Sequence, residues 1–284
     1  MPKDFAQLRS QVERALAGRV AAPFEYRDRR ATENASTGID EIDLLTGGFP
    51  RGALTEIFGP ACSGRTSLLV SALGMRTAHA EACALIDACD AFDPCHAEAA
   101  GVELKQLLWV RCRNIGQALR ATDLLLQGGG FSFVCLDLID VPREMVRKLP
   151  LDAWFRFRRA VENTQTILVI VEQESNAKTC ASLVLKLEGG LVHWSTTPQR
   201  GIVQAHSEDF SRPSFAQLLD GLDVHAGVLR SRMNPVGKME FREGRISSAT
   251  NGPSGSLETI FRANAMRGRL TGACIEPKLE SFEN

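Results

Sequence analysis

The amino-acid sequence lacks an excess of charge of either sign. Its 33 basic and 34 acidic residues give a formal net charge of -1. A chain without a positive field of its own is not drawn to nucleic acid as a whole. We therefore expect any contact with DNA to be weak, or to come from a local patch or through a protein partner.

Long apolar runs are also missing. The stretch from Ile167 to Val171 is one of the longest, and it is far too short to cross a lipid bilayer. No segment resembles a secretory signal. We expect a cytoplasmic protein that does not contact a membrane.

The eight cysteines include no C-x-x-C pair. Several of them, such as Cys83 and Cys135, lie in apolar runs, where cysteine behaves as a small hydrophobic residue. We therefore expect no disulfide framework. Cys89, Cys95 and His96 are close in sequence and could suggest a metal site, but their flanking residues argue against one, and we expect no tightly bound metal.

From residue 37 onward, short apolar runs alternate with helical patterns. This alternation predicts an α/β fold with crossover units, a mostly parallel sheet and helices on both faces. The expected strands are 53–58, 83–87, 106–110, 133–138 and 166–172, and the expected helices are 66–79, 115–126 and 151–161. Later runs near 182–187, 224–230 and 238–242 have no comparable helices between them, so we expect them to extend the sheet by antiparallel pairing.

The sequence divides into three parts by composition. Residues 3–17 have apolar side chains at helical spacing and predict an arm that packs on the core or contacts another subunit. Residues 247–256 are rich in serine, glycine, asparagine and proline. We therefore predict an N-terminal helix and linker at 1–35, a core domain at 36–245 and a flexible C-terminal tail at 246–284.

A phosphate-binding loop is the most informative motif. The run from Gly59 to Thr66 has the spacing of G-x-x-x-x-G-K-[ST], and it follows an expected strand and opens an expected helix. Such a loop points successive backbone N–H groups into one concavity, and the helix N-terminus adds positive potential. Arg65 stands where this motif has lysine; it keeps the charge and can hold phosphate, but its planar fork is poorly suited to follow a transferring phosphoryl group. The alternative is a turn that no longer binds nucleotide.

Four mostly apolar residues lead to Asp137, which gives the form of a Walker B strand. Such a strand delivers a carboxylate to the water shell of a magnesium ion. Many strands end in aspartate, so the motif gains its meaning from the phosphate loop that precedes it.

Several segments together resemble the RecA recombinase family over about residues 36–245. RecA's C-terminal domain has no counterpart here. The similar segments are 36–38, 47–52, 56–60, 87–94, 101–102, 172–173 and 228–241.

The resemblance implies a site for ATP and Mg²⁺. In it, Thr66 and Asp137 would serve the magnesium ion, Asp93 and His96 would lie by the adenine, and Gln173 would sense the nucleotide. The nucleotide-binding residues implied in this way are Gly59, Ser63, Gly64, Arg65, Thr66, Ser67, Asp93, His96, Asp137 and Gln173.

The same resemblance places Arg230 and Arg232 against the ATP of a neighbouring subunit, so a homo-oligomer is a possible assembly. Cys89 occupies the position of RecA's catalytic glutamate, and a thiol is a poor base for aligning water. Asp87 and Asp90 are neighbours, but neither is an obvious replacement. We therefore assign no catalytic residue and expect nucleotide binding without efficient hydrolysis.

The segments that bind DNA in RecA are short in this sequence, at 138–149 and 174–180. Basic residues interleave with Trp154, Phe155 and Phe157, which could indicate a nucleic-acid patch. Helical spacing favours a second interpretation, in which the aromatic rings lie in the core and the arginines lie in solvent.

Eroded catalytic positions, trimmed loops and a missing C-terminal domain resemble the ImuA type of RecA-like proteins. That resemblance implies an accessory role in SOS mutagenesis, with translesion polymerase subunits or RecA as partners. Two alternatives remain at this point: an active DNA-dependent ATPase and recombinase, and a scaffold that binds no nucleotide.

Overall fold

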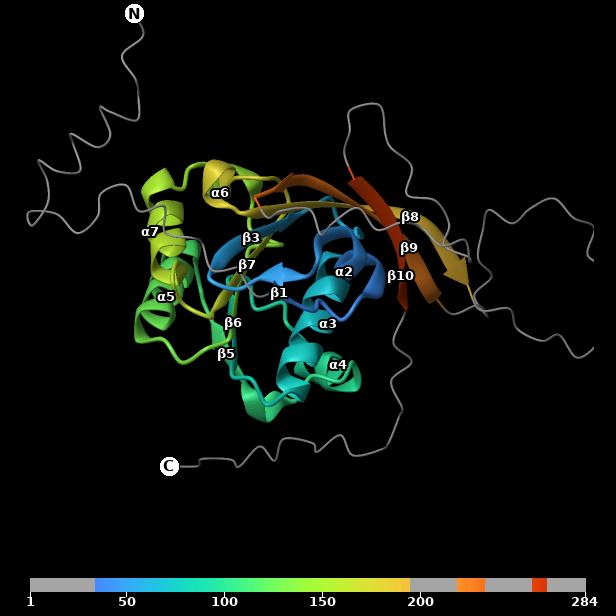
Figure 1. Ribbon diagram of the computed structural model, residues 1–284, viewed down its shortest axis with the longest axis horizontal. Coiled ribbons are helices and arrows are strands. Elements are labelled where there is room, and N and C mark those ends of the chain that lie inside the picture. Colours follow the sequence, from blue (N-terminus) through green and yellow to red (C-terminus); the bar gives the residue numbers. More distant parts are fainter. Residues whose placement is uncertain (1–33, 195–218, 233–256, 265–284) are drawn as a thin grey trace, which may run out of the picture. The chain divides into compact units, whose positions relative to one another are not determined.

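The computed structural model describes residues 34–194, 219–232 and 257–264. Most of them build one sheet with the strand order β10-β9-β8-β3-β7-β6-β4-β5 (Figure 1). Two short strands, β1 (Asn34–Ala35) and β2 (Phe49–Pro50), pair separately. The strands of the large sheet are β3 (Ala53–Phe58), β4 (Cys83–Asp87), β5 (Leu107–Arg111), β6 (Phe133–Asp137), β7 (Ile167–Glu172), β8 (Leu183–Trp194), β9 (Leu219–Ser231) and β10 (Leu257–Asn264).

The six neighbouring strands β8, β3, β7, β6, β4 and β5 are parallel to one another. Strand β9 is antiparallel to β8, and β10 is antiparallel to β9. The expected α/β fold with antiparallel C-terminal strands is therefore confirmed, with one correction. The first of the late strands, β8, is parallel to β3, with Leu183 opposite Thr55. The reason is that the chain after β7 crosses over β3 before β8 begins.

Helices cover both faces of the sheet, as expected (Figure 1). Ile42 and Leu68 belong to one buried cluster, whereas Ala118 and Trp154 belong to the other. The first face carries α2 (Asp40–Thr46), α3 (Arg65–Ala78) and α4 (Pro94–Ala99), and the second carries α5 (Ile115–Gly128), α6 (Arg143–Arg147) and α7 (Leu151–Val161). No helix in the described ranges is long and apolar enough to span a bilayer.

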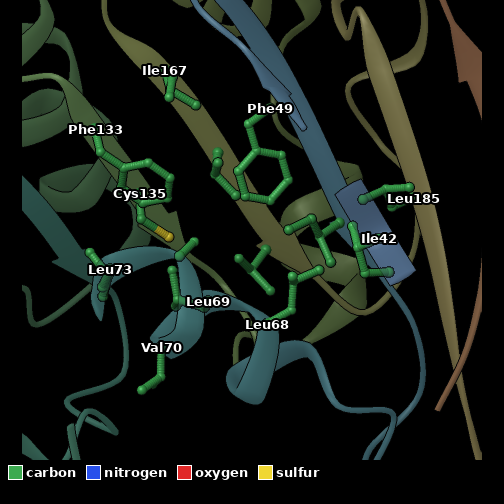
Figure 2. Packing of buried hydrophobic residues seen from close by; sticks show 14 of the residues in the cluster. Ile42, Phe49, Leu68, Leu69, Val70, Leu73, Phe133, Cys135, Ile167 and Leu185 are labelled. Carbon is green, nitrogen blue, oxygen red and sulfur yellow. The ribbon is translucent and has the colours of Figure 1, made fainter. Parts of the chain in front are cut away.

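The central strand β7 is buried along its whole length. Val169 packs in the cluster under α3, and its neighbour Ile170 packs in the cluster under α7, because successive side chains of a strand point to opposite faces. Figure 2 shows the first cluster, in which Leu68 and Phe49 lie between the helix and the sheet. Each fully buried side chain of this size contributes about 1.5–3 kcal/mol to folding.

The prediction of a flexible tail at 246–284 is wrong for residues 257–264. These residues form β10, which pairs with β9 along its length, and the Phe261 side chain is only 2% exposed. Helix α2 contacts the same strand. This segment joins the sheet because the Phe261 ring reaches the core and the backbone pairs with β9. The expected helix at 3–17 and the expected strand at 238–242 lie outside the described residues.

Replacement of Phe261 by alanine tests this assignment. We expect the free energy of unfolding to fall by about 3–5 kcal/mol, because the substitution leaves a cavity in the core. Ile260→Ala is the matched control, since Ile260 is 54% exposed and its loss should change stability by less than about 0.5 kcal/mol. Urea denaturation measures both values, and equal effects of the two variants would contradict the placement of β10.

Candidate nucleotide-binding site

The phosphate loop joins β3 to α3 at the carboxyl ends of the parallel strands. Cys62 and Gly64 have φ angles of 57° and 80°, in the left-handed region. A Cβ atom on Gly64 would lie 2.5 Å from Cγ2 of Val224, and one on Gly59 would lie 2.1 Å from the carbonyl oxygen of Leu187. Only glycine fits these two positions, because the loop packs closely on β8 and β9.

The loop retains features that suit a phosphate group. The Ser63 hydroxyl is buried and has no hydrogen-bond partner in the described part of the chain. Thr66 and Ser67 are exposed in the first turn of α3. Because the N-terminus of this long helix carries partial positive charge, the loop can hold an anion, and Thr66 is free to serve a magnesium ion.

Arg65, by contrast, is directed into the protein. Its side chain is buried, and Nη1 donates a hydrogen bond of 2.8 Å to the carbonyl oxygen of Glu172 at the end of β7. Burial lowers the pKa of Arg65, while the carboxylates of Asp137 and Asp140 oppose that change. The charge that a phosphate loop aims at its ligand is therefore engaged inside this chain.

Asp137 lies at the carboxyl end of β6, as expected for a Walker B acid. Its Oδ1 accepts a hydrogen bond of 2.9 Å from the N–H of Ile139. Burial raises the pKa of Asp137 to about 7, although that hydrogen bond opposes the rise. The position fits a carboxylate that becomes fully ionised when a divalent cation is near.

Asp87 and Asp90, the carboxylates that neighbour Cys89 in the sequence, are both engaged within the protein. Asp87 is buried and accepts hydrogen bonds from the N–H groups of Cys89 and Phe92, each at 3.0 Å. Asp90 forms an ion pair with Arg111. Partial burial and the Asp140 carboxylate raise the pKa of the Cys89 thiol, so it remains protonated at neutral pH. None of these groups is placed to act as a general base.

A hollow that the sequence did not reveal lies beside these residues, at the carboxyl ends of β4 and β5. Its volume is about 640 Å³. The Arg111 guanidinium stacks over the Trp109 ring, 5.0 Å from the ring centre, at the same strand end. The residues that line the hollow are Ala88, Cys89, Asp90, Arg111, Cys112 and Arg113.

Gln173 follows β7, and both the nitrogen and the oxygen of its side-chain amide form hydrogen bonds. Its Nε2 donates to the carbonyl oxygen of Ile139 at 2.8 Å, and its Oε1 accepts from Nε of Arg143 at 2.8 Å. The residue that the resemblance assigns as a nucleotide sensor therefore links β7 to the segment after β6.

Arg230 and Arg232 contact their own chain. Their guanidinium groups donate to the carbonyl oxygens of Lys178 and Thr179, in the short 3₁₀ helix η2 (Lys178–Cys180). The predicted contact with the nucleotide of another subunit stays a prediction.

Asp93 and His96 are both exposed, at the start of α4. The Asp93 carboxylate caps this helix by accepting from the N–H groups of Cys95, at 2.9 Å, and His96, at 3.2 Å. Their assignment to the adenine also stays a prediction. Within the described ranges, no group of three or more cysteine, histidine or acidic side chains could hold a metal ion.

A pair of buried carboxyl groups was not anticipated. Glu56 in β3 accepts hydrogen bonds from the N–H groups of Asn176 and Ala177, at 2.6 and 2.7 Å, and from the Ser175 hydroxyl at 2.7 Å. Burial raises the pKa of Glu172 to about 10, and the neighbouring Glu56 carboxyl adds to the rise. Glu172 is therefore protonated at neutral pH. A single glutamate within the apolar run of β3 was the signal that could have revealed the pair.

Two of the three aromatic rings in the basic and aromatic segment lie in the core, as the packing interpretation predicts. Trp154 and Phe157 are buried and meet edge to face, with ring centroids 6.2 Å apart. Phe155 is 42% exposed. Arg143 and Arg147 form ion pairs with Glu174, which joins the two segments that would hold DNA in RecA.

Comparison with known families agrees with this geometry. Residues 7–147 match the family model of the RecA N-terminal domain. Over this region the chain is similar to the RecA N-terminal domain. The match includes the phosphate loop and Asp137, and it begins before residue 36, where we placed the start of the RecA-like core.

The raised pKa of the buried Glu172 gives a pH test of this site. Folded Glu172 retains a proton up to a pH of about 10, whereas the unfolded chain loses it near the ordinary value of 4.5. Its contribution to stability is therefore complete below 4.5 and falls as the pH rises toward 10. Glu172→Gln keeps a neutral group there, so we expect its unfolding free energy to decline less steeply between pH 7.5 and 8.5, by at most about 1.4 kcal/mol per pH unit.

Urea denaturation at the two pH values measures the slope. Glu174→Gln is the control, because the nearby Arg147 guanidinium lowers the pKa of the exposed Glu174 and keeps its titration well below pH 7.5. Parallel slopes for the wild type and Glu172→Gln would show that Glu172 is ionised in the folded protein.

Proposed function

We propose that this RecA-like chain is an accessory protein of the DNA-damage (SOS) response that acts in translesion mutagenesis through protein partners. The observation that carries the proposal is the bond from Arg65 to the carbonyl oxygen of Glu172. It removes from the phosphate loop the cation on which phosphoryl transfer depends.

Impaired hydrolysis follows from two positions considered together. Phosphoryl transfer needs a positioned charge on the terminal phosphates and a group that orients the attacking water. Arg65 is turned inward, and Cys89 carries a protonated thiol where a base is required. These features support the ImuA type over an active recombinase.

Nucleotide binding itself remains compatible with the loop. The backbone N–H groups of residues 61–66 would hold the phosphates of ATP, while Thr66 and Asp137 would serve its Mg²⁺. The bound nucleotide would supply a charged group at the carboxyl edge of the sheet. In this proposal ATP is bound and not cleaved, because the groups that would cleave it are replaced.

Protein partners fit the surface better than DNA does. Arg143 and Arg147 are already paired with Glu174, and the net charge is -1. A grip on single strands needs free cations and stacking rings along an open groove. We propose translesion polymerase subunits or RecA as the partners of this cytoplasmic protein, with DNA reached through them.

A double substitution tests the assignment of the two lost groups. Arg65→Lys combined with Cys89→Glu should raise ATP hydrolysis in the presence of single-stranded DNA by about a hundredfold, the lower end of the range for a restored base. Release of inorganic phosphate measures the rate. Arg65→Lys with Cys95→Glu is the matched control, since Cys95 is also exposed but lies on α4. Wild-type turnover as fast as that of the restored variant would favour an active ATPase.

Co-purification tests the proposed role in the cell. We expect a tagged chain, recovered from cells treated with a DNA-damaging agent, to bring down translesion polymerase subunits or RecA, identified by mass spectrometry. Damage-induced mutation frequency should fall when the chain is deleted, while survival by recombination stays unchanged. Unaided strand exchange by the purified protein would contradict the accessory role.

A further inference from the structure

The crossover at residues 173–182 links β7 to β8 by passing over β3. Parallel strands are usually joined by a dozen or more residues, often including a helix. This connection has only the short η2, and Ala177 and Ala181 within it are fully buried. The buried backbone polar groups of such a short segment each need a partner.

The first part of the crossover is bound to the strand beneath it. Glu56 accepts from the N–H groups of Asn176 and Ala177, and Glu172 accepts from Nδ2 of Asn176 at 3.0 Å. Two buried carboxyl groups, one in β3 and one at the end of β7, therefore hold the turn.

The end of β7, where the crossover begins, is bound to the phosphate loop. Arg65, the first residue of α3, reaches the carbonyl oxygen of Glu172, and the adjacent Gln173 is bonded to Ile139 and Arg143. The Arg65 side chain thus connects the phosphate loop to the end of β7.

The far end of the crossover is bound to β9. Arg230 and Arg232 donate to the carbonyl oxygens of Lys178 and Thr179. Cys180 is buried directly after this contact. The crossover is thus held at its start, its middle and its end.

We propose that Arg65 is a positioning residue that ties the phosphate loop to the crossover in place of a nucleotide, so that the crossover keeps one conformation with or without ATP. A ligand shifts a conformation only as far as it binds two states differently. In this proposal the bond from Arg65 fixes the strand end at which the crossover starts, so the protein with ATP and the protein without it would hold the crossover in the same state. This inference concerns the geometry alone and does not depend on the role in mutagenesis.

Hydrogen exchange at the backbone amides of residues 173–182 tests the tie. In the wild type, we expect slow exchange at Asn176 and Ala177, changed by less than about threefold on adding ATP and Mg²⁺. Arg65→Met removes the donor and keeps the length of the side chain. It should speed exchange at these amides by about tenfold without nucleotide, because a charge-assisted hydrogen bond is lost. Arg120→Met, an exposed position on α5, is the control and should match the wild type.

Two results would overturn the proposal. One is wild-type exchange in Arg65→Met, and the other is a change of more than about threefold in the wild type when ATP and Mg²⁺ are added. If Arg65→Met also speeds exchange throughout β3 and β6, the substitution has loosened the core. Exchange in the Arg65→Lys variant then tests the tie. The shorter lysine should speed exchange at the crossover alone, and an unchanged crossover in that variant would refute the tie.

Discussion

The passage of the chain over β3 is the constraint on which the rest of the site depends. Strands β7 and β8 both lie beside β3 and run parallel to it, so residues 173–182 must cross its face within a short span. The crossing buries backbone amides that no neighbouring strand can pair, and unpaired amides are costly in a protein interior. Glu56 accepts two of them, at 2.6 and 2.7 Å. A carboxyl group within an apolar strand is thereby explained by the path of the chain above it.

The buried carboxyl group of Glu56 affects the pKa of its neighbour Glu172. Burial raises the pKa of Glu172, and the neighbouring Glu56 carboxyl, which accepts the crossover amides, adds to the rise. The carbonyl oxygen of Glu172 meanwhile receives the Arg65 guanidinium. Crossover, carboxyl pair and phosphate loop thus form one hydrogen-bonded network, and the arginine in the phosphate loop is part of the interior of the protein.

Sequence patterns predicted the elements of this fold better than its long-range contacts. The strands from β3 to β7, with the helices α3, α5 and α7, follow from apolar periodicity and the glycines of the phosphate loop. The parallel direction of β8 did not follow, because periodicity carries no information on the path between strands. Nor did β10, whose hold on the sheet depends on the buried ring of Phe261 and on pairing with β9. The inward turn of Arg65 depends on a carbonyl oxygen 107 positions away in the chain, which local spacing cannot reveal.

Arg65 and Cys89, at the positions that the resemblance assigns to the lysine and the glutamate of RecA, are both influenced by the carboxylates of Asp137 and Asp140. The carboxylates of Asp140, Asp137 and Asp87 all act on the thiol at position 89 and raise its pKa. A glutamate there would add a fourth negative charge to the group. In a phosphate loop with lysine, the outward ammonium and the magnesium ion would offset that negative charge. Here the Arg65 guanidinium is buried and donates to the carbonyl oxygen of Glu172, so it offsets less of the charge. A neutral side chain at position 89 therefore fits electrostatically with an arginine at position 65 that is directed into the protein.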